Sequence, residues 1–183
     1  MLSPDLVLLD LMLPGMNGLD ICRELRASPR TANIPILMLT AKAEETDQVV
    51  GFAVGADDYV TKPFSVKVLL QRIKVLLRRT TNPEPAGEMI AAAGIQIDKR
   101  GHQVTVEDVP VSLTPTEFRL LETLMRQPGR AFTRHDLMEA AVGDAIVLER
   151  TIDVHIKTLR RKLGNSDLIE TVRSIGYRFR ESL

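Results

Sequence analysis

The chain has 183 residues, of which 44% are hydrophobic and 26% charged, and its 24 basic side chains balance its 24 acidic ones. Such a chain can build a core of one large or two small domains, and no apolar run approaches membrane-spanning length. The single cysteine fits a reducing compartment, so we expect a cytoplasmic protein. The single cysteine, Cys22, excludes an internal disulfide framework and, within a helical pattern, favours a buried structural thiol.

The first part of the chain, residues 1–79, alternates predicted strands and helices. Apolar runs predict buried strands at 5–10, 34–39 and 57–61, and amphipathic spacing with helix caps predicts helices at 18–27, 44–54 and 65–79. This alternation favours a parallel sheet, in which the active crevice lies beyond the carboxyl ends of the strands.

A polar residue closes each of these strands. Asp10, Thr40 and Lys62 stand at successive strand ends, so an acid, a hydroxyl and an amine should converge on one spot. Each residue alone has an ordinary explanation, as a turn cap, a filler or a solvated charge. Three successive strand ends favour a shared site instead.

The second part of the chain changes pattern after a polar, proline-bearing linker at 80–87. Short alternating apolar runs over 90–115 predict a small antiparallel sheet. A helix-start signature lies at 114–117, with a threonine cap, a proline and a glutamate, and Thr133 caps a second helix. The last residues predict a hairpin with Gly176 near its turn.

The stretch 149–163 has the pattern of an amphipathic helix with a cationic outer side. Its apolar stripe consists of Ile152, Ile156, Leu159 and Leu163. From residue 150 to residue 180 there are eight Lys and Arg against three Asp and Glu, a local excess that suits a DNA major groove, although an ordinary surface helix is the alternative. Three helices and a terminal hairpin predict a winged helix-turn-helix, whose hairpin reaches an adjacent minor groove or the backbone.

Six motifs occur in series along the chain: LLDLMLPGMNGLDICRELR, PILMLTA, GADDYVTKPF, LTPTEFRLLETL, RTIDVHIKTLRRKL and TVRSIGYRFR. Together they resemble the response regulators of the OmpR/PhoB type. The resemblance implies a truncated receiver domain at 1–79, a linker at 80–87 and a winged-helix DNA-binding domain at 88–183. The implied fold class is α/β, a partial doubly wound (flavodoxin-like) receiver that lacks its first two strands, followed by an α+β winged helix-turn-helix domain.

The resemblance also implies roles at the strand ends. Asp10 would be the phosphoacceptor of a two-component phosphorelay and would receive the phosphoryl group from a sensor histidine kinase. Thr40 and Lys62 would contact the phosphoryl oxygens, Tyr59 would move with Thr40, and the bond after Lys62 would be cis. Asp10 and the main-chain carbonyl of Met12 would ligate Mg²⁺.

The second domain would bind double-stranded DNA, with tandem direct repeats as its sites and RNA polymerase as a further partner. The resemblance places ten residues at the DNA: Arg150, Thr151, Val154, His155, Lys157, Thr158, Arg161, Thr171, Arg173 and Tyr177. For His155 a neutral imidazole that contacts phosphate or is partly packed is preferred to a catalytic role, and Tyr177 could belong to the wing core with its hydroxyl outward. The basic helix argues against a purely protein-binding module, and we expect no enzyme because no catalytic triad or phosphate-cradling glycine loop occurs.

The chain departs from the family pattern at its front. A complete receiver has on the order of forty further residues there, including the acidic pair that binds Mg²⁺, so Mg²⁺ binding is in doubt. The alternative function is therefore a phosphorylation-independent DNA-binding regulator, and the strand at 6–9 would form an exposed apolar edge. A misplaced start codon is the explanation we favour, over a split gene or a regulator that works without phosphate.

The family also forms homodimers through the fourth helix, fifth strand and fifth helix of the receiver. Gln48 and Val68 occupy the positions of one basic–acidic pair of that face, so that bridge is lost, whereas Asp58 and Arg72 keep another. Surface ion pairs contribute little each, so we still expect the dimer.

Overall fold

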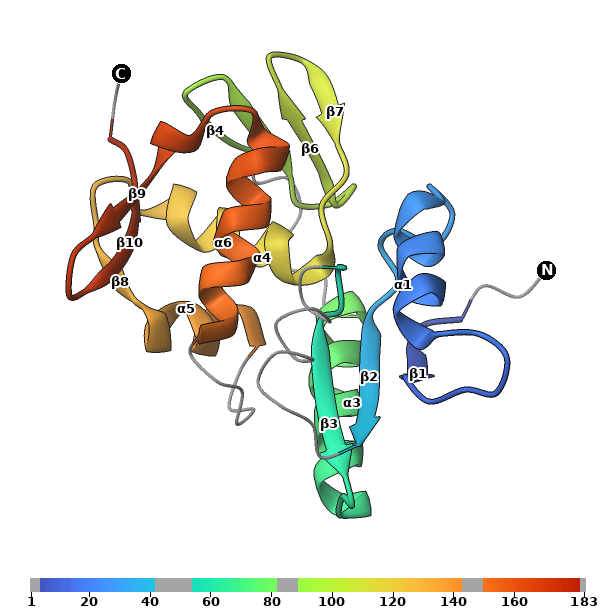
Figure 1. The fold of residues 1–183 in the computed structure, drawn as a ribbon. Coiled ribbons are helices and arrows are strands. Elements are labelled where there is room, and N and C mark those ends of the chain that lie inside the picture. Colours follow the sequence, from blue (N-terminus) through green and yellow to red (C-terminus); the bar gives the residue numbers. More distant parts are fainter. Residues whose placement is uncertain (1–3, 42–53, 82–88, 143–149, 182–183) are drawn as a thin grey trace. The chain divides into compact units, whose positions relative to one another are not determined.

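The computed structural model describes residues 4–41, 54–81, 89–142 and 150–181 (Figure 1). The chain divides into two compact units, Met1–Asn82 and Pro83–Leu183. The helix predicted at 44–54 lies outside the described residues except for its last position, and so does the loop at 143–148. None of the described helices is long and apolar enough to cross a membrane.

The first unit is built on a parallel sheet with strand order β1-β2-β3, as the alternating pattern predicts. Its elements in chain order are β1 (Val7–Asp10), α1 (Gly18–Ala27), β2 (Ile36–Ala41), β3 (Asp58–Lys62) and α3 (Val66–Thr81). The side chain of Asn17 accepts the Leu19 N–H and so caps α1. The helix α3 continues through Thr81, two residues beyond the helix predicted at 65–79.

The two faces of this sheet carry separate apolar clusters, since side chains alternate along each strand. Ile36 and Met38 of β2 pack with Cys22 of α1, whereas Leu37 packs with Leu76 of α3. The helices α1 and α3 therefore cover opposite faces. The polar strand ends at Asp10 and Lys62 belong to neither cluster.

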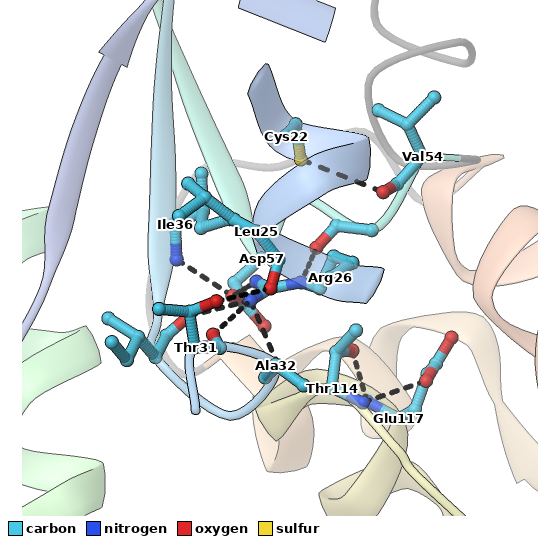
Figure 2. Close-up of polar contacts among 12 residues, drawn as sticks. Cys22, Leu25, Arg26, Thr31, Ala32, Ile36, Val54, Asp57, Thr114 and Glu117 are labelled. Atoms are coloured by element: carbon cyan, nitrogen blue, oxygen red, sulfur yellow. Dashed lines mark hydrogen bonds and ion pairs between the residues drawn. The ribbon is translucent and has the colours of Figure 1, made fainter. Parts of the chain in front are cut away.

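Arg26, whose side chain is 11% exposed, links the segments at the amino ends of β2 and β3. Arg26 of α1 donates to the carbonyl oxygen of Gly55 at 2.8 Å. Figure 2 shows its bonds to the carbonyl oxygen of Ala32 (3.0 Å) and to the carboxylate of Asp57 (2.7 Å). Asp57 is fully buried, and the same carboxylate oxygen accepts the Ile36 N–H at 2.9 Å. The pair of Arg26 and Asp57 thus links α1 to the loop before β2, to the first residue of β2 and to the residue before β3.

The second unit begins with an antiparallel sheet of order β4-β5-β6-β7 and continues with three helices and a second small sheet of order β8-β10-β9. The elements are β4 (Met89–Ala92), β5 (Ile95–Asp98), β6 (Gln103–Val106), β7 (Val109–Val111), α4 (Pro115–Arg126), β8 (Phe132–Thr133), α5 (Arg134–Val142), α6 (Arg150–Leu163), a 3₁₀ turn (Ser166–Leu168), β9 (Ile169–Val172) and β10 (Gly176–Phe179). One apolar cluster draws on all three helices and on strands of both sheets. This is the predicted winged helix-turn-helix.

The helix starts follow their sequence signatures. The Thr114 hydroxyl accepts the Glu117 N–H (3.3 Å), and the Glu117 carboxylate accepts the Thr114 N–H (2.8 Å), which completes a capping box (Figure 2). Thr133 and Asp136 exchange the same pair of bonds at the start of α5.

A glycine lets the hairpin of β9 and β10 join β8. A Cβ atom at Gly176 would lie 2.2 Å from the carbonyl oxygen of Phe132. Only glycine permits this backbone approach, so β10 pairs with β8 on one side and β9 on the other. Gly176 begins β10 itself, and the turn of the hairpin is formed by residues 173–175.

Candidate functional site

Two of the three predicted strand-end residues meet directly. The ammonium group of Lys62, at the end of β3, contacts one carboxylate oxygen of Asp10, at the end of β1. The other oxygen of Asp10 accepts the Met12 N–H at 3.0 Å. These contacts, the Lys62 hydrogen bond first, lower the pKa of Asp10. The carboxylate is therefore ionised at neutral pH, and its side chain remains 28% exposed.

The backbone around Asp10 is fixed by a close approach of α1. Gly18, the first residue of α1, is buried, and a Cβ atom there would lie 2.5 Å from the Asp10 carbonyl oxygen. The Leu11 N–H donates to the Leu39 carbonyl at 3.0 Å. A glycine at residue 18 therefore allows the helix to pack against the strand end that presents the acid.

The remaining predicted residues of this site lie nearby in the fold but make other contacts. Thr40 is buried near the end of β2, and its hydroxyl donates to the Ala41 carbonyl at 2.9 Å. Tyr59 is half-buried against the cluster on the α1 side, and burial, followed by the Asp58 charge, raises the pKa of its phenol. Met12 is exposed. The Lys62–Pro63 peptide bond is cis, as expected.

The predicted dimer pair closes within one chain. Arg72 of α3 contacts both carboxylate oxygens of Asp58 at 2.7 Å each. Asp58 is buried, and the Arg72 side chain is only 11% exposed. Val68 is exposed, and Gln48 lies outside the described residues. The pair therefore stabilises the packing of α3 on β3 in a single chain.

The helix α6 has the predicted two-sided character. All four residues of its apolar stripe are buried: Ile152, Ile156, Leu159 and Leu163. Lys157 and Arg161, one turn apart, are exposed, and neither forms an ion pair with a described residue. Val154 and Thr158 are partly exposed. This outer side is cationic and accessible to an anion.

Two residues expected at the DNA are buried instead. Thr151 is 3% exposed and His155 is 2% exposed, so the prediction that they face DNA is corrected. They precede Ile152 and Ile156 by one residue each, and the buried stripe of a globular helix is wide enough to include such neighbours. The packed alternative for His155 is the one that agrees with the structure. The side chain of Arg150 lies outside the described part of the chain.

The wing residues divide in the same way. Thr171 and Arg173 are exposed, Arg173 at the hairpin turn. Tyr177 is 5% exposed and belongs to the core, and its hydroxyl donates to Asp153 of α6 at 2.7 Å. The expectation that this hydroxyl points outward to DNA is therefore wrong, because a buried phenol takes the nearest acceptor.

Three supporting residues near this surface escaped the sequence reading. Arg160 donates to the Ile169 carbonyl (2.9 Å) and the Thr171 hydroxyl (2.9 Å), so it binds the hairpin. Lys162 contacts the buried Glu117 carboxylate at 2.6 Å. Arg134 shares Asp153 with Tyr177. Their sequence signal is only a basic residue beside an apolar stripe, which does not distinguish an internal from an external partner.

Comparison with known proteins identifies the family that carries both the Asp10–Lys62 pair and the cationic helix α6. Residues 1–74 match the model of the response regulator receiver domain, and residues 108–179 match that of the C-terminal domain of transcriptional regulatory proteins. The phosphate regulon transcriptional regulatory protein PhoB of Rhizobium meliloti is 49% identical over 178 residues, a match that covers 95% of this chain and 78% of the relative. The chain belongs to the OmpR/PhoB family of response regulators.

Further relatives of this response regulator give the same assignment. PhoB of Escherichia coli strain K12 is 44% identical over 180 residues, covering 96% of this chain and 78% of the relative. Among solved structures, a mutant of RitR is similar with a TM-score of 0.74 and 27% identity, over 97% of this chain and 79% of that one. This response regulator is thus a DNA-binding transcriptional regulator of a two-component system, with a receiver domain followed by a winged-helix domain.

Proposed function

We propose that this response regulator accepts a phosphoryl group on Asp10 from a sensor histidine kinase and binds duplex DNA through the outer side of α6. The observation that carries the first half is the contact between Asp10 and Lys62 across the ends of β1 and β3. Phosphoryl transfer needs an in-line nucleophile and cations that neutralise charge, and this pair supplies one of each.

The proposed transfer moves one phosphoryl group from the kinase to Asp10. An Asp10 carboxylate oxygen attacks the phosphorus of the kinase's phosphohistidine, a phosphorus–oxygen bond forms, and the phosphorus–nitrogen bond to the imidazole breaks. Lys62 then pairs with the phosphoryl oxygens. Thr40 turns its hydroxyl from the Ala41 carbonyl toward the phosphoryl group. The phosphoryl group thereby replaces these local contacts with new ones, and the new contacts favour one of two conformations of the receiver over the other.

Mg²⁺ is the cofactor that the family implies. The donor types fit, because Mg²⁺ takes hard oxygen ligands, retains several waters and is bound through one or two carboxylates. Asp10 and the Met12 carbonyl would hold it, and it would neutralise charge on the phosphoryl oxygens. Within the described ranges no group of three or more His, Cys, Asp or Glu gathers as a metal site, so the protein's share of the ligands is at the low end.

Acetyl phosphate tests the first half of the proposal. We expect the wild-type chain, incubated with acetyl phosphate and Mg²⁺, to gain one phosphoryl group by intact-mass spectrometry, and Asp10→Asn to gain none. Asp20→Asn, at an exposed aspartate of α1, is the matched control and should label like the wild type. Labelling of Asp10→Asn to the wild-type extent would overturn the assignment, and absence of labelling in the wild type would favour a regulator that works without phosphate.

Salt-dependent DNA binding tests the second half. In this proposal Lys157 and Arg161 contact phosphates or guanine edges, so binding should weaken steeply with salt. The probe is a fluorescein-labelled duplex that the protein itself selects from a random-sequence library. Joint charge reversal, Lys157→Glu with Arg161→Glu, should abolish binding, whereas Arg100→Glu, on an exposed turn of the same unit, should change it little. Equal losses in both variants would contradict the role of α6.

The receiver also supports a homodimer in this proposal. Pairing through β3, α3 and the segment at 44–54 would place two copies of α6 on tandem direct repeats and present the complex to RNA polymerase. We expect phosphorylation to favour this pairing, while the contact between Arg72 and Asp58 stays within each chain. Sedimentation of the chain before and after acetyl phosphate treatment measures this change, and a monomer under both conditions would exclude it.

A further inference from the structure

A polar junction connects the DNA-facing helix to the wing. One carboxylate oxygen of Asp153, in the first turn of α6, accepts the Tyr177 hydroxyl of β10 at 2.7 Å and the Arg134 Nε of α5 at 2.8 Å. The Tyr177 ring has the guanidinium carbons of Arg134 and Arg160 at 5.3 Å and 5.5 Å from its centroid. We call Asp153, Tyr177, Arg134 and Arg160 the Asp153 junction.

The junction reaches the hairpin at a second point. Arg160, on the next turns of α6, donates to the Ile169 carbonyl and the Thr171 hydroxyl of β9. Both strands of the wing are therefore attached to one helix by side chains, β10 through Asp153 and β9 through Arg160. Burial, followed by the hydrogen bond to Asp153, raises the pKa of Tyr177, so the phenol remains a proton donor.

The place of the junction matters because DNA offers two grooves at a fixed separation. A helix in the major groove and a wing tip at the neighbouring groove or backbone bind together only if their relative orientation matches the duplex. A wing that is ordered before binding avoids the loss of freedom that a loose one suffers on binding. Asp153 itself is 44% exposed, so its ion pair alone contributes little to folding.

We propose that Asp153 and Tyr177 are positioning residues that couple the wing tip at Arg173 to the recognition helix α6 when the protein binds DNA. This inference rests on the proposed DNA-binding role of α6. Tyr177 acts without touching DNA, since its ring is buried and its hydroxyl is bound to Asp153. The wing tip adds its full share of affinity only while the junction holds it at the correct angle.

A double-mutant cycle on the full chain tests the coupling, with fluorescence anisotropy on the duplex selected by the wild-type protein. We expect Arg173→Ala to weaken DNA binding about tenfold in the wild type and less than about threefold in Tyr177→Phe, which keeps the packed ring but lacks the hydroxyl. The matched control is Glu170→Gln, which removes the charge that pairs with Arg178 and Arg180; among the described residues neither partner belongs to α6. In that control Arg173→Ala should again weaken binding about tenfold.

The possible results distinguish failure of the proposed coupling from failure of the proposed DNA-binding role of α6. Equal effects of Arg173→Ala in Tyr177→Phe and in the wild type overturn the inference alone. Absence of salt-dependent binding by the wild type, or binding that survives charge reversal at Lys157 and Arg161, overturns both. If Tyr177→Phe lacks a cooperative thermal transition, Asp153→Asn takes its place in the cycle, because it retains an oxygen acceptor and loses the charge that orients both donors.

Discussion

The two units place their functional residues differently relative to the residues that support them. In the first unit, the Asp10–Lys62 pair lies at the carboxyl ends of the strands, and the buried Arg26–Asp57 pair fastens the amino ends of β2 and β3. In the second, exposed Lys157 and Arg161 alternate along one helix with Asp153 and Lys162, which hold that helix. In the first unit, the supporting residues lie a strand's length away from the functional residues. In the second unit, at most a few residues of the same helix separate them.

This difference predicts how substitutions propagate. A change at the support of the first unit should lower stability and leave the chemistry at Asp10 intact wherever the unit remains folded. A change at a support of the second unit should alter binding itself, because the same helix carries both roles. We therefore expect substitutions to differ in the free energy of unfolding or of DNA binding that they remove, according to burial and position.

Loss of the buried carboxylate in the first unit should have the largest effect. Asp57→Ala leaves the Arg26 guanidinium buried without its charged partner, and breaking such a pair lowers the free energy of unfolding by about 3–5 kcal/mol. Hydrogen exchange of the amides of β2 and β3 measures the loss in this unit alone. Stability within about 0.5 kcal/mol of the wild type would show that the pair does not support the sheet.

Truncation on the outer side of α6 comes next. Arg161→Ala should weaken DNA binding by about 1–3 kcal/mol and reduce the salt dependence of binding. The melting temperature should stay unchanged, because Arg161 is exposed and unpaired among the described residues. A lower melting temperature with unchanged affinity for DNA would contradict this role, because Arg161 would then stabilise the fold and not bind DNA.

The Cys22 thiol gives a smaller, pH-dependent effect in the first unit. Burial raises the pKa of this thiol from 9.0 to about 11, and its sulfur contacts the Val54 carbonyl at 3.6 Å. Because the folded state retains the proton longer, the stability it provides is fully present below pH 9 and is lost as the pH rises through about 11. Urea unfolding of the wild type and of Cys22→Ala across this range isolates the thiol, and parallel pH profiles would contradict it.

The smallest effect is expected for an exposed pair. Asp20→Ala removes the contact with Arg23 on α1, where both side chains are more than half exposed. Such a pair contributes about 0.5 kcal/mol or less to the free energy of unfolding. Hydrogen exchange of the α1 amides measures this loss. A loss of stability comparable to that of Asp57→Ala would contradict the expectation that buried ion pairs contribute more than exposed ones.

The sequence was sufficient to predict that Asp10 and Lys62 meet at the strand ends, but not the contact of the Thr40 hydroxyl with Ala41 or the details of α6. Parallel topology alone brings the ends of β1 and β3 to one edge, so Asp10 and Lys62 follow from their positions. On a helix, each residue turns by about 100°, and the width of the buried stripe decides whether Thr151 and His155 face in or out. That width depends on packing against α4 and α5, which no local pattern contains.

The sequence also could not predict which side chains on different elements form hydrogen bonds or ion pairs with each other. Glu117 carries a clear capping signature, yet its contact with Lys162 joins residues 45 positions apart. Tyr177 belongs to a hairpin motif, but the acceptor of its hydroxyl lies on another element. Long-range polar contacts of this kind depend on how elements pack, whereas caps and strand alternation depend on neighbours in the chain.

Gly176 has a consequence for retargeting this regulator to new operators. Since its backbone lies against Phe132 with no space for a side chain, any library that varies residue 176 should mostly yield detached hairpins. The three residues of the turn, 173–175, and the exposed positions of α6 lie outside that contact. Exchange of DNA preference between members of the family can thus be confined to a few surface side chains grafted onto an unchanged frame.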